Sequence, residues 1–351
     1  MRNRSAAMAA PEPRVFIVVL NWNGLADTMQ CLDSLGRLKY RGELRTVVVD
    51  NGSQDGSTAI LRSRYPGITL IENGRNLGYT GGNNVGLRFA LANGADYVWL
   101  LNNDTTVDPE SLSSLVAAAE ATKQVGLLSP EVWNPSSGEV QWVGTVLDVG
   151  RRRLVDVLET EKRGVSLPEG PLLLWGTGIL IKRMAAEAVG DLDDRYFAYV
   201  EDFDYSLRII KAGMETRVVR EARIFHRASR SLGELSPSRH YLMVRNRYLF
   251  WKSHLGRDWT WREMGRRIAE ILGEAEEWER GHRQEISGAC LDALWDAVRG
   301  HFGDMTRKGR MPWLVRRVLM WRPYLWIRLL QGRWAEILIR FGSGPWKKRG
   351  R

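Results

Sequence analysis

The chain has 351 residues, of which 44% are hydrophobic and 26% are charged. A chain of this length and composition can bury a sizeable core and is long enough for a catalytic domain with an appended region. Its two cysteines, Cys31 and Cys290, are too few for a disulfide framework and favour a reducing, cytoplasmic setting. We expect neither a signal peptide nor a transmembrane helix, because no stretch reaches roughly 18 uncharged apolar residues.

The net charge of +10 is concentrated at the end of the sequence. Residues 301–351 contain 13 Lys and Arg against two acids, so the first 300 residues carry 38 basic and 39 acidic side chains. A body with almost no net charge does not suit nucleic-acid binding, and we expect no nucleic-acid partner. The basic tail therefore needs an explanation of its own.

Strand-like and helix-like segments alternate from residue 15 onward. The first apolar run is rich in β-branched residues, which is typical of a strand buried on both faces. Asp108-Pro109-Glu110 predicts a helix start with an N-cap and a proline at the first helical position. Four βα units in succession predict a mainly parallel sheet with helices on both faces. The predicted strands are 15–20, 46–49, 68–71 and 97–101, and the predicted helices are 25–35, 57–65 and 82–92.

The alternation becomes irregular after residue 125 and ends near residue 235. Short β-like segments at 139–147 and 172–181 predict a mixed strand order there. From Ser236 onward only helical patterns remain, and they are rich in Arg and Trp. We expect three parts, which are a disordered leader over 1–13, a catalytic domain over 14–235 and a helical, basic region over 236–351.

Polar clusters follow four of the predicted strands, at 21–23, 50–53, 73–76 and 102–104. Each cluster alone is typical of a turn. Because ligands of parallel sheets bind at the carboxyl ends of the strands, four clusters in register favour a nucleotide site. The Gly-rich segment 78–86 would let a helix N-terminus approach an anion, although it matches neither a P-loop nor a dinucleotide fingerprint.

Two groups of acidic residues are candidates for the chemistry. Asp104 follows a predicted strand, where it can be a helix cap or a ligand of a divalent cation that bridges nucleotide phosphates. Glu201, Asp202 and Asp204 begin a helical pattern, where acids also serve as first-turn residues. Beside a cation we expect the pKa of such an Asp to be lowered, which suits a general base only if the acceptor hydroxyl is held close. A single His such as His226 typically makes structural hydrogen bonds, and it becomes a candidate metal or diphosphate ligand only together with the other motifs.

Together these motifs resemble glycosyltransferase family 2, the inverting enzymes with a GT-A fold. The resemblance covers about residues 14–232 and is closest to bacterial rhamnosyltransferases of cell-envelope polysaccharide synthesis. Segments 245–247 and 293–303 resemble that subgroup more weakly. The motifs, in chain order, are VVLNWNG at 18–24, VVDNGSQDGS at 48–57, NGRNLGYTGGNN at 73–84, LNNDT at 101–105, GTG at 176–178, YVEDFD at 199–204 and FH at 225–226.

The resemblance implies a GT-A fold, a Rossmann-like mixed sheet that is mainly parallel and flanked by helices. It implies Asp202, within the pair Glu201-Asp202, as the catalytic base. It also implies Asp104 as the last acid of a DxD-type metal motif whose first acid is replaced by Asn102, with His226 completing a metal or diphosphate site. The implied acceptor or diphosphate residues are Gly176, Thr177 and Gly178. Those implied to bind the nucleotide sugar are Asn21, Asn23, Asp50 (the base), Asn51, Arg75, Asn76, Gly81, Asn83, Asn103 and Asp104.

The implied reaction is transfer of one sugar from dTDP-rhamnose to a hydroxyl of a glycan or polyprenyl-diphosphate-linked acceptor, with Mn²⁺ or Mg²⁺ as cofactor. The processive Gln-x-x-Arg-Trp signature is only approximated at 331–334, so we expect one addition per binding event. The alternatives are a UDP-hexose or GDP-hexose donor, a nucleotidyltransferase, and an inactive membrane-associated scaffold. A nucleotidyltransferase would have a Lys or Arg in the loop after the first strand, and segment 21–27 contains neither. The presence of Asp50, Asp104 and Asp202 together argues against an inactive scaffold.

The segment 311–341 alternates Trp with Arg. Its charges recur too often for a membrane-spanning helix, but Trp beside Arg suits the headgroup layer. We therefore expect a peripheral, cytoplasmic protein on the inner face of the cell membrane. The alternative is a basic helical subdomain that packs on the catalytic domain or mediates homo-oligomers. The Trp residues of this segment are Trp313, Trp321, Trp326 and Trp334.

Overall fold

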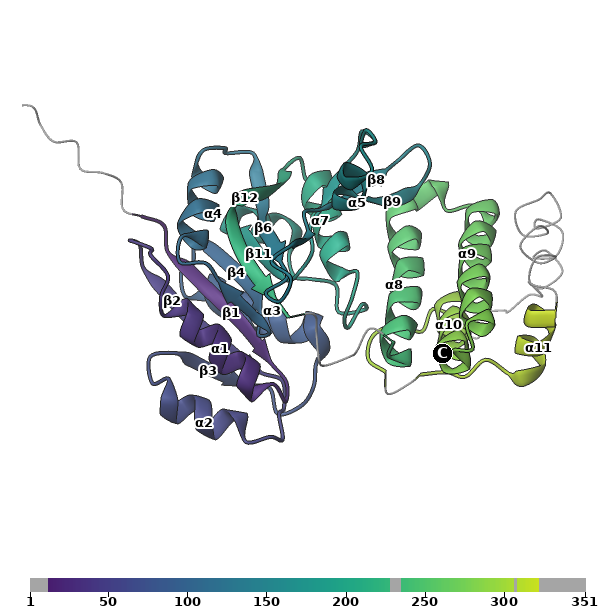
Figure 1. Ribbon diagram of the computed structural model, residues 1–351, viewed down its shortest axis with the longest axis horizontal. Coiled ribbons are helices and arrows are strands. Elements are labelled where there is room, and N and C mark those ends of the chain that lie inside the picture. Colours follow the sequence, from purple (N-terminus) through teal and green to yellow (C-terminus); the bar gives the residue numbers. More distant parts are fainter. Residues whose placement is uncertain (1–11, 228–234, 306–307, 322–351) are drawn as a thin grey trace, which may run out of the picture. The chain divides into compact units, whose positions relative to one another are not determined.

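The computed structural model describes residues 12–227, 235–305 and 308–321 (Figure 1). The expected leader lies almost wholly outside these residues, as do Trp326, Trp334 and the segment 331–334. The chain divides into two compact units, Met1–Asp193 with Glu201–Ala228, and Asp194–Val200 with Ser229–Arg351. Seven residues that precede Glu201 thus belong to the second unit, a division that the sequence pattern does not indicate.

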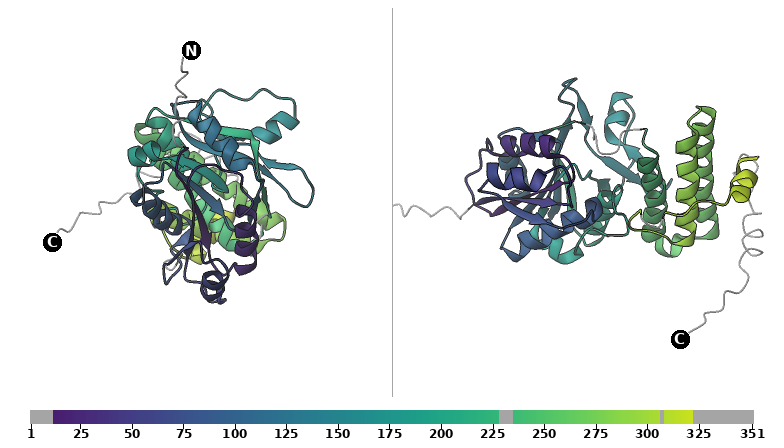
Figure 2. Two further views of the ribbon diagram at one scale, coloured as in Figure 1. Left: turned by 90° about the vertical axis from the view of Figure 1, so that its left-hand side faces the viewer. Right: turned by 90° about the horizontal axis from the view of Figure 1, so that it is seen from below.

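The first unit is built on one large mixed sheet flanked by helices (Figures 1 and 2). Its described strands run in the order β3-β2-β1-β4-β11-β6-β12-β5, with β7 paired to β6, and β10-β8-β9 form a small second sheet. The strands are β1 (Val15–Asn21), β2 (Leu44–Asp50), β3 (Thr69–Glu72), β4 (Tyr97–Asn102), β5 (Thr105–Val107), β6 (Val125–Trp133), β7 (Val140–Trp142), β8 (Thr145–Asp148), β9 (Arg153–Asp156), β10 (Leu172–Leu173), β11 (Gly178–Lys182) and β12 (Glu215–His226). The helices are α1 (Leu25–Leu35), α2 (Ser57–Arg64), α3 (Gly78–Ala92), α4 (Ser111–Glu120), α5 (Val157–Lys162), α6 (Arg183–Val189) and α7 (Glu201–Lys211).

The four strands β3, β2, β1 and β4 are parallel, as the βα alternation predicts. The side chains from Val15 to Val19 are fully buried, because helices cover both faces of β1. β11 runs antiparallel to both β4 and β6, which makes the sheet mixed. The predicted mixed, mainly parallel sheet is therefore confirmed.

Two of the glycines in the segment 78–86 serve packing. A Cβ atom on Gly82 would lie 2.3 Å from Leu20 Cδ1, and one on Gly86 would lie 2.2 Å from Val18 Cγ1. These glycines let α3 lie directly on β1. The proposed approach to an anion therefore does not apply to Gly82 or Gly86, which face the core.

The helix start predicted at Asp108-Pro109-Glu110 is wrong in detail. Helix α4 begins at Ser111, and its N-cap is Glu110, whose side chain makes no capping hydrogen bond. Asp108 Oδ1 instead accepts the backbone N–H of Glu110 at 3.0 Å. Asp108 and Pro109 therefore form a turn that precedes the helix.

The described part of the second unit is helical, which confirms the expected C-terminal extension (Figure 1). Tyr241, Leu272 and Cys290 lie in its apolar core. Among the described helices, none combines the length and the apolar character that crossing a membrane requires. The elements are α8 (Pro237–Leu255), the short 3₁₀ helix η1 (Gly256–Asp258), α9 (Trp261–Arg280), α10 (Gln284–Arg299) and α11 (Trp313–Trp321).

Candidate active site

The carboxyl ends of the parallel strands lie at one edge of the sheet. The register pairs Asn21 with Asp50 across β1 and β2, Asp50 with Glu72 across β2 and β3, and Leu20 with Asn102 across β1 and β4. The polar clusters predicted after these strands are thus neighbours in space. This edge is where ligands of parallel α/β sheets bind.

The buried pair Asn21 and Asp50 organises the loop after β2. Asn21 is fully buried, and its Nδ2 donates to Asp50 Oδ1 at 2.7 Å and to Ser53 Oγ at 3.0 Å. Asp50 Oδ2 accepts the backbone N–H groups of Gly52 and Ser53 at 3.1 and 2.9 Å. Asn23 joins this loop, because its Oδ1 accepts the N–H of Gln54 at 2.7 Å. These hydrogen bonds give the loop one conformation.

A second buried asparagine, Asn51, holds the loop after β3. Its Nδ2 donates to Asn76 Oδ1 at 3.1 Å and to Gly78 O at 2.9 Å, and its Oδ1 accepts the N–H of Leu77 at 3.2 Å. Gly52, with φ +77°, lies under Arg75, since a Cβ atom there would be 2.7 Å from the Arg75 backbone. The exposed Arg75 has no hydrogen-bond or ion-pair partner within the described ranges.

Two further predicted site residues make hydrogen bonds to helices, Asn103 to α1 and Asn83 within its own helix α3. Asn103 Nδ2 donates to Thr28 Oγ1 at 2.9 Å, and Gly24 has no room for a Cβ atom beside it. Asn83 is 1% exposed, and its Nδ2 donates to Tyr79 O at 3.0 Å. Gly81 lies half-buried in the first turns of α3. The structure thus gathers these predicted residues around one end of the sheet.

Asp104 and His226 meet where β12 pairs with β5. Their side chains are 14% and 17% exposed, and Asp104 Oδ1 lies 3.3 Å from His226 Nε2. Among the residues that the structure describes, neither the buried Nε2 nor the buried Asn102 Oδ1 has a hydrogen-bond partner. Two atoms that ligate one cation at roughly 2.1–2.2 Å lie about 3–3.5 Å apart, so this pair fits a cation. Over the described residues, no group of three or more His, Cys, Asp or Glu side chains is arranged so that it could hold a metal ion.

The predicted catalytic pair begins α7. Asp202 Oδ2 accepts the backbone N–H of Gly176 at 2.7 Å, and Gly176 O accepts the hydroxyl of Tyr79 at 2.5 Å. Glu201 is 4% exposed, and its Oε2 makes no hydrogen bond. The chain thus brings α3, the segment before β11 and the start of α7 together at this carboxylate.

Burial controls the protonation of this pair. It raises the pKa of Asp202 to about 6, although the N–H groups of Gly176 and Phe203 act in the opposite direction. Burial, with the negative charge of Asp202 beside it, also raises the pKa of Glu201 well above its usual value. Without a cation beside Asp202, desolvation therefore outweighs the helix N-terminus, and the lowered pKa expected beside a cation stays a prediction.

Tyr79 and Trp175 complete the site but are not assigned a role from the sequence. Burial and the charges of Glu201, Asp202 and Asp104 raise the pKa of Tyr79 well above its usual value, so its hydroxyl stays protonated and donates to Gly176 O. Trp175 is 38% exposed and stacks on the buried Trp142, with ring centroids 4.9 Å apart. Trp175 adjoins the GTG motif, and this adjacency is the one sequence signal that could have identified it.

The GTG motif also contributes to the sheet. Thr177 O accepts the backbone N–H of Asn102 at 3.0 Å. Gly178 pairs with Leu101, and a Cβ atom on it would lie 2.8 Å from Ile224 Cδ1. Gly176 is therefore the member of the motif that contacts the Asp202 carboxylate, whereas Gly178 serves packing.

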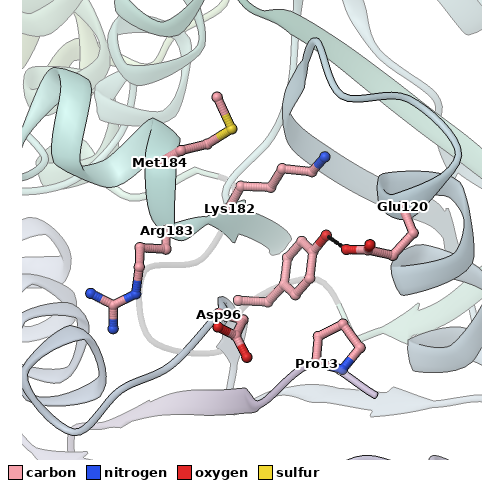
Figure 3. A pocket seen from close by; sticks show the side chains of 7 residues that line it. Pro13, Asp96, Glu120, Lys182, Arg183 and Met184 are labelled. Atoms are coloured by element: carbon pink, nitrogen blue, oxygen red, sulfur yellow. Dashed lines mark hydrogen bonds between the residues drawn. The ribbon is translucent and has the colours of Figure 1, made fainter. Parts of the chain in front are cut away.

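A separate cavity lies at the opposite end of β4 (Figure 3). Tyr97, the first residue of this strand, donates its hydroxyl to Glu120. Lys182 Nζ donates to Ala119 O at 2.6 Å. None of the predicted site residues lines this cavity. The candidate active site is therefore the edge that contains Asp104 and Asp202.

The sheet order and the carboxylates at its strand ends define a GT-A nucleotide-sugar glycosyltransferase. The fold is similar to that of the mannosyltransferase PcManGT from Pyrobaculum calidifontis, with a TM-score of 0.52 and 17% identity over 94% of this chain and 86% of that one. The model of the family described as "Glycosyl transferase family 2" matches residues 15–190, half of the chain. The chain belongs to this family, as the motifs predict.

The chain is also similar in sequence to individual characterised transferases. An N-acetylglucosaminyl-diphospho-decaprenol L-rhamnosyltransferase of Mycobacterium tuberculosis is 28% identical over 58% of this chain and 76% of its own length. The galactofuranosyltransferase GlfT1 of the same organism is 30% identical over 60% of this chain and 69% of its own. The dTDP-rhamnosyl transferase RfbF of Shigella flexneri is 21% identical over 52% and 62%. Similarity to rhamnosyltransferases is thereby confirmed.

Proposed function

We propose that the protein transfers rhamnose from dTDP-rhamnose to a sugar hydroxyl on a polyprenyl-diphosphate-linked acceptor, with inversion at the anomeric carbon. The observation that carries the proposal is Asp202, a half-buried carboxylate at the start of α7 whose Oδ2 accepts the N–H of Gly176 and whose pKa is raised by burial. The names of the M. tuberculosis and S. flexneri relatives support the sugar and the acceptor class.

Asp202 acts as the general base. A base works best when its pKa lies near the operating pH, and burial brings the pKa of Asp202 to about 6. Its carboxylate accepts the proton of the acceptor hydroxyl as that oxygen attacks the anomeric carbon. Attack from the face opposite the nucleotide diphosphate inverts the anomeric centre. The N–H of Gly176 keeps the carboxylate pointed in one direction during this step.

The donor diphosphate lies on the side of Asp104 and His226. These two side chains, with Asn102 Oδ1, would hold Mn²⁺ or Mg²⁺, because Asp104 Oδ1 lies 3.3 Å from His226 Nε2. The buried Nε2 and Asn102 Oδ1 also have no hydrogen-bond partner among the described residues. A bound divalent cation supplies positive charge that offsets the charge growing on the departing diphosphate. Arg75, exposed and unpaired among the described residues, adds a positive charge for the nucleotide.

The acceptor sugar packs on Trp175. The exposed face of this indole lies next to Gly176 and is stiffened by its stacking on Trp142. The apolar C–H face of a pyranose matches such an aromatic surface, while its hydroxyls remain available for Asp202. Asp50, Asn51, Asn76 and the other loop residues then bind the nucleotide.

The C-terminal helix α11 brings the enzyme to the inner face of the membrane, where a polyprenyl acceptor is presented. Trp313 and Trp321 are 70% and 79% exposed, and Arg317 is exposed on the same helix. Indole rings and basic side chains suit an anionic headgroup layer. Replacing both Trp residues by Ser should release the protein from anionic vesicles, whereas unchanged binding favours the alternative of a packed or oligomer-forming subdomain.

The donor is tested directly with a panel of dTDP-rhamnose, UDP-hexoses and GDP-hexoses. We expect dTDP-rhamnose to raise the melting temperature most, since a ligand that binds only the folded state stabilises it. We also expect rhamnose transfer to decaprenyl-diphospho-N-acetylglucosamine. Transfer from a UDP- or GDP-hexose instead would establish the alternative donor. Absence of transfer from every donor would favour the inactive scaffold.

A further inference from the structure

The catalytic pair follows directly on a segment that belongs to the other unit. Residues 194–200 form part of the helical unit, and Glu201 and Asp202 begin α7 of the first unit. The chain therefore passes from the helical unit into α7 immediately before these two acids.

The segment has an unusual backbone. Phe197, Tyr199 and Val200 have φ values of +64°, +70° and +73°, and none of them is glycine. The left-handed region is unfavourable for residues with a Cβ atom, most of all for a β-branched residue such as Val200. Three such residues within four positions persist only where surrounding contacts impose the conformation. Strain of this kind is concentrated at functional sites.

One side chain of α8 gathers the carbonyls of this segment. Asn246 is fully buried, and its Nδ2 lies 2.8 Å from Tyr196 O, 2.7 Å from Ala198 O and 2.8 Å from Tyr199 O. A side-chain amide has two N–H groups, so three carbonyls share one nitrogen. The backbone must turn tightly for the three carbonyls to reach one nitrogen atom, and the positive φ values are those of such a turn.

A buried network fixes the orientation of that amide. Arg245 is 1% exposed; its Nε donates to Asn246 Oδ1 at 3.1 Å and its Nη2 to Tyr196 O at 3.1 Å. Its guanidinium lies over the ring of Tyr241, whose hydroxyl donates to the buried Asp296 at 2.6 Å. The amide of Asn246 is thus held with its Nδ2 toward the segment.

We propose that Asn246, oriented by Arg245, is a positioning residue for catalysis, which holds residues 196–199 in a strained curl and so sets where Glu201 and Asp202 lie. The proposal rests on the proposed role of Asp202 as the base. It gives the helical unit a function in the chemical step that is separate from any binding to membranes.

Three variants separate positioning from general stability. Asn246→Ala removes the shared donor. Arg267→Ala is the matched control, because Arg267 is an equally buried polar residue of the helical unit that contacts Glu263 and Trp251. Asn246→Ala combined with Val200→Gly is the rescue, since glycine adopts a positive φ without the Cβ penalty.

Two readouts are used, and the first needs no substrate. Hydrogen exchange of peptides covering 196–205 should become faster in Asn246→Ala and stay at the wild-type rate in Arg267→Ala. With dTDP-rhamnose and decaprenyl-diphospho-N-acetylglucosamine, kcat of Asn246→Ala should fall about a hundredfold, as expected for a misplaced catalytic group, with the donor KM nearly unchanged. The double variant should recover part of that loss.

The outcomes are distinct. Unchanged exchange over 196–205, or an unchanged kcat despite faster exchange, overturns the proposal. A loss of kcat that Arg267→Ala reproduces and Val200→Gly does not relieve shows a merely structural role. Asp202→Asn is assayed in parallel. If it is inactive while Asn246→Ala is normal, positioning fails and the proposed function stands; if it stays active, the base assignment itself is wrong.

Discussion

At the scale of single residues, the two acids proposed for the chemistry, Asp202 and Asp104, lie in different environments. Asp202 is half-buried at a helix start with a raised pKa, whereas Asp104 lies against His226 at the end of the sheet. The sequence supplies the identity of both acids but not their burial. The direction of the Asp202 pKa shift could not be predicted from the sequence, because desolvation by the surrounding fold raises this pKa against the hydrogen bonds from the Gly176 and Phe203 N–H groups.

Asp202→Asn should lower kcat at least about a hundredfold while leaving the affinity for the donor nearly unchanged. The amide keeps the size of the carboxylate but cannot accept the acceptor proton. Steady-state kinetics and donor titration measure the two quantities. Glu201→Gln is the matched control, and if it alone reproduces the loss, the base is Glu201.

The pH dependence of both rate and stability follows from the same carboxylate. The rate should fall as the pH drops below about 6, because protonated Asp202 cannot act as a base. Its folded-state pKa is raised, so the folded state binds more protons than the unfolded state between about pH 4 and 6, and stability should fall as the pH rises through this range. Asp202→Asn should weaken this fall in melting temperature, and an identical fall in the variant would contradict the assignment.

Removal of the divalent cation should abolish transfer, and Mn²⁺ or Mg²⁺ should restore it. His226→Ala should raise the Mn²⁺ concentration needed for half-maximal rate, since it removes one of the proposed ligands. His301→Ala, in the helical unit, should leave that concentration unchanged. Full activity in excess chelator would show that the Asp104 site works without a cation.

At the scale of elements, helices and strands with clear periodicity are predictable. The predicted helix 25–35 matches α1, and the strand 97–101 falls within β4. The antiparallel β11 and β5 are not predictable in the same way, because their direction is set by long-range pairing with β4 and β12 rather than by local pattern. The curl at 197–200 is likewise imposed by α8.

Gly82→Ala should destabilise the protein by about 1–3 kcal/mol, because its methyl group would enter the space of Leu20. Gly273→Ala is the control within α9, where no atom lies within 4 Å of the added Cβ. This second change should stabilise slightly, since alanine is the better helix former. Chemical unfolding measures both; equal stability of the two variants would contradict the close packing of α3 on β1.

At the scale of the whole molecule, the chain is a family 2 glycosyltransferase whose helical unit includes the residues that immediately precede the proposed catalytic pair. Sequence motifs suffice for the family, since they lie at strand ends where ligands bind. The assignment of 194–200 to the helical unit depends on contacts between residues about 50 positions apart, such as Asn246 with Tyr196. No local pattern reports such contacts.

The anomeric configuration of the product tests the central claim most directly. In the proposed mechanism, Asp202 activates the acceptor hydroxyl, which displaces the nucleotide diphosphate once, from the opposite face of the anomeric carbon. NMR of the disaccharide formed from dTDP-rhamnose and decaprenyl-diphospho-N-acetylglucosamine should therefore show an anomeric configuration opposite to that of the donor. A product that retains the donor configuration would contradict the account, because retention requires two displacements or a front-face mechanism in which Asp202 is not the base.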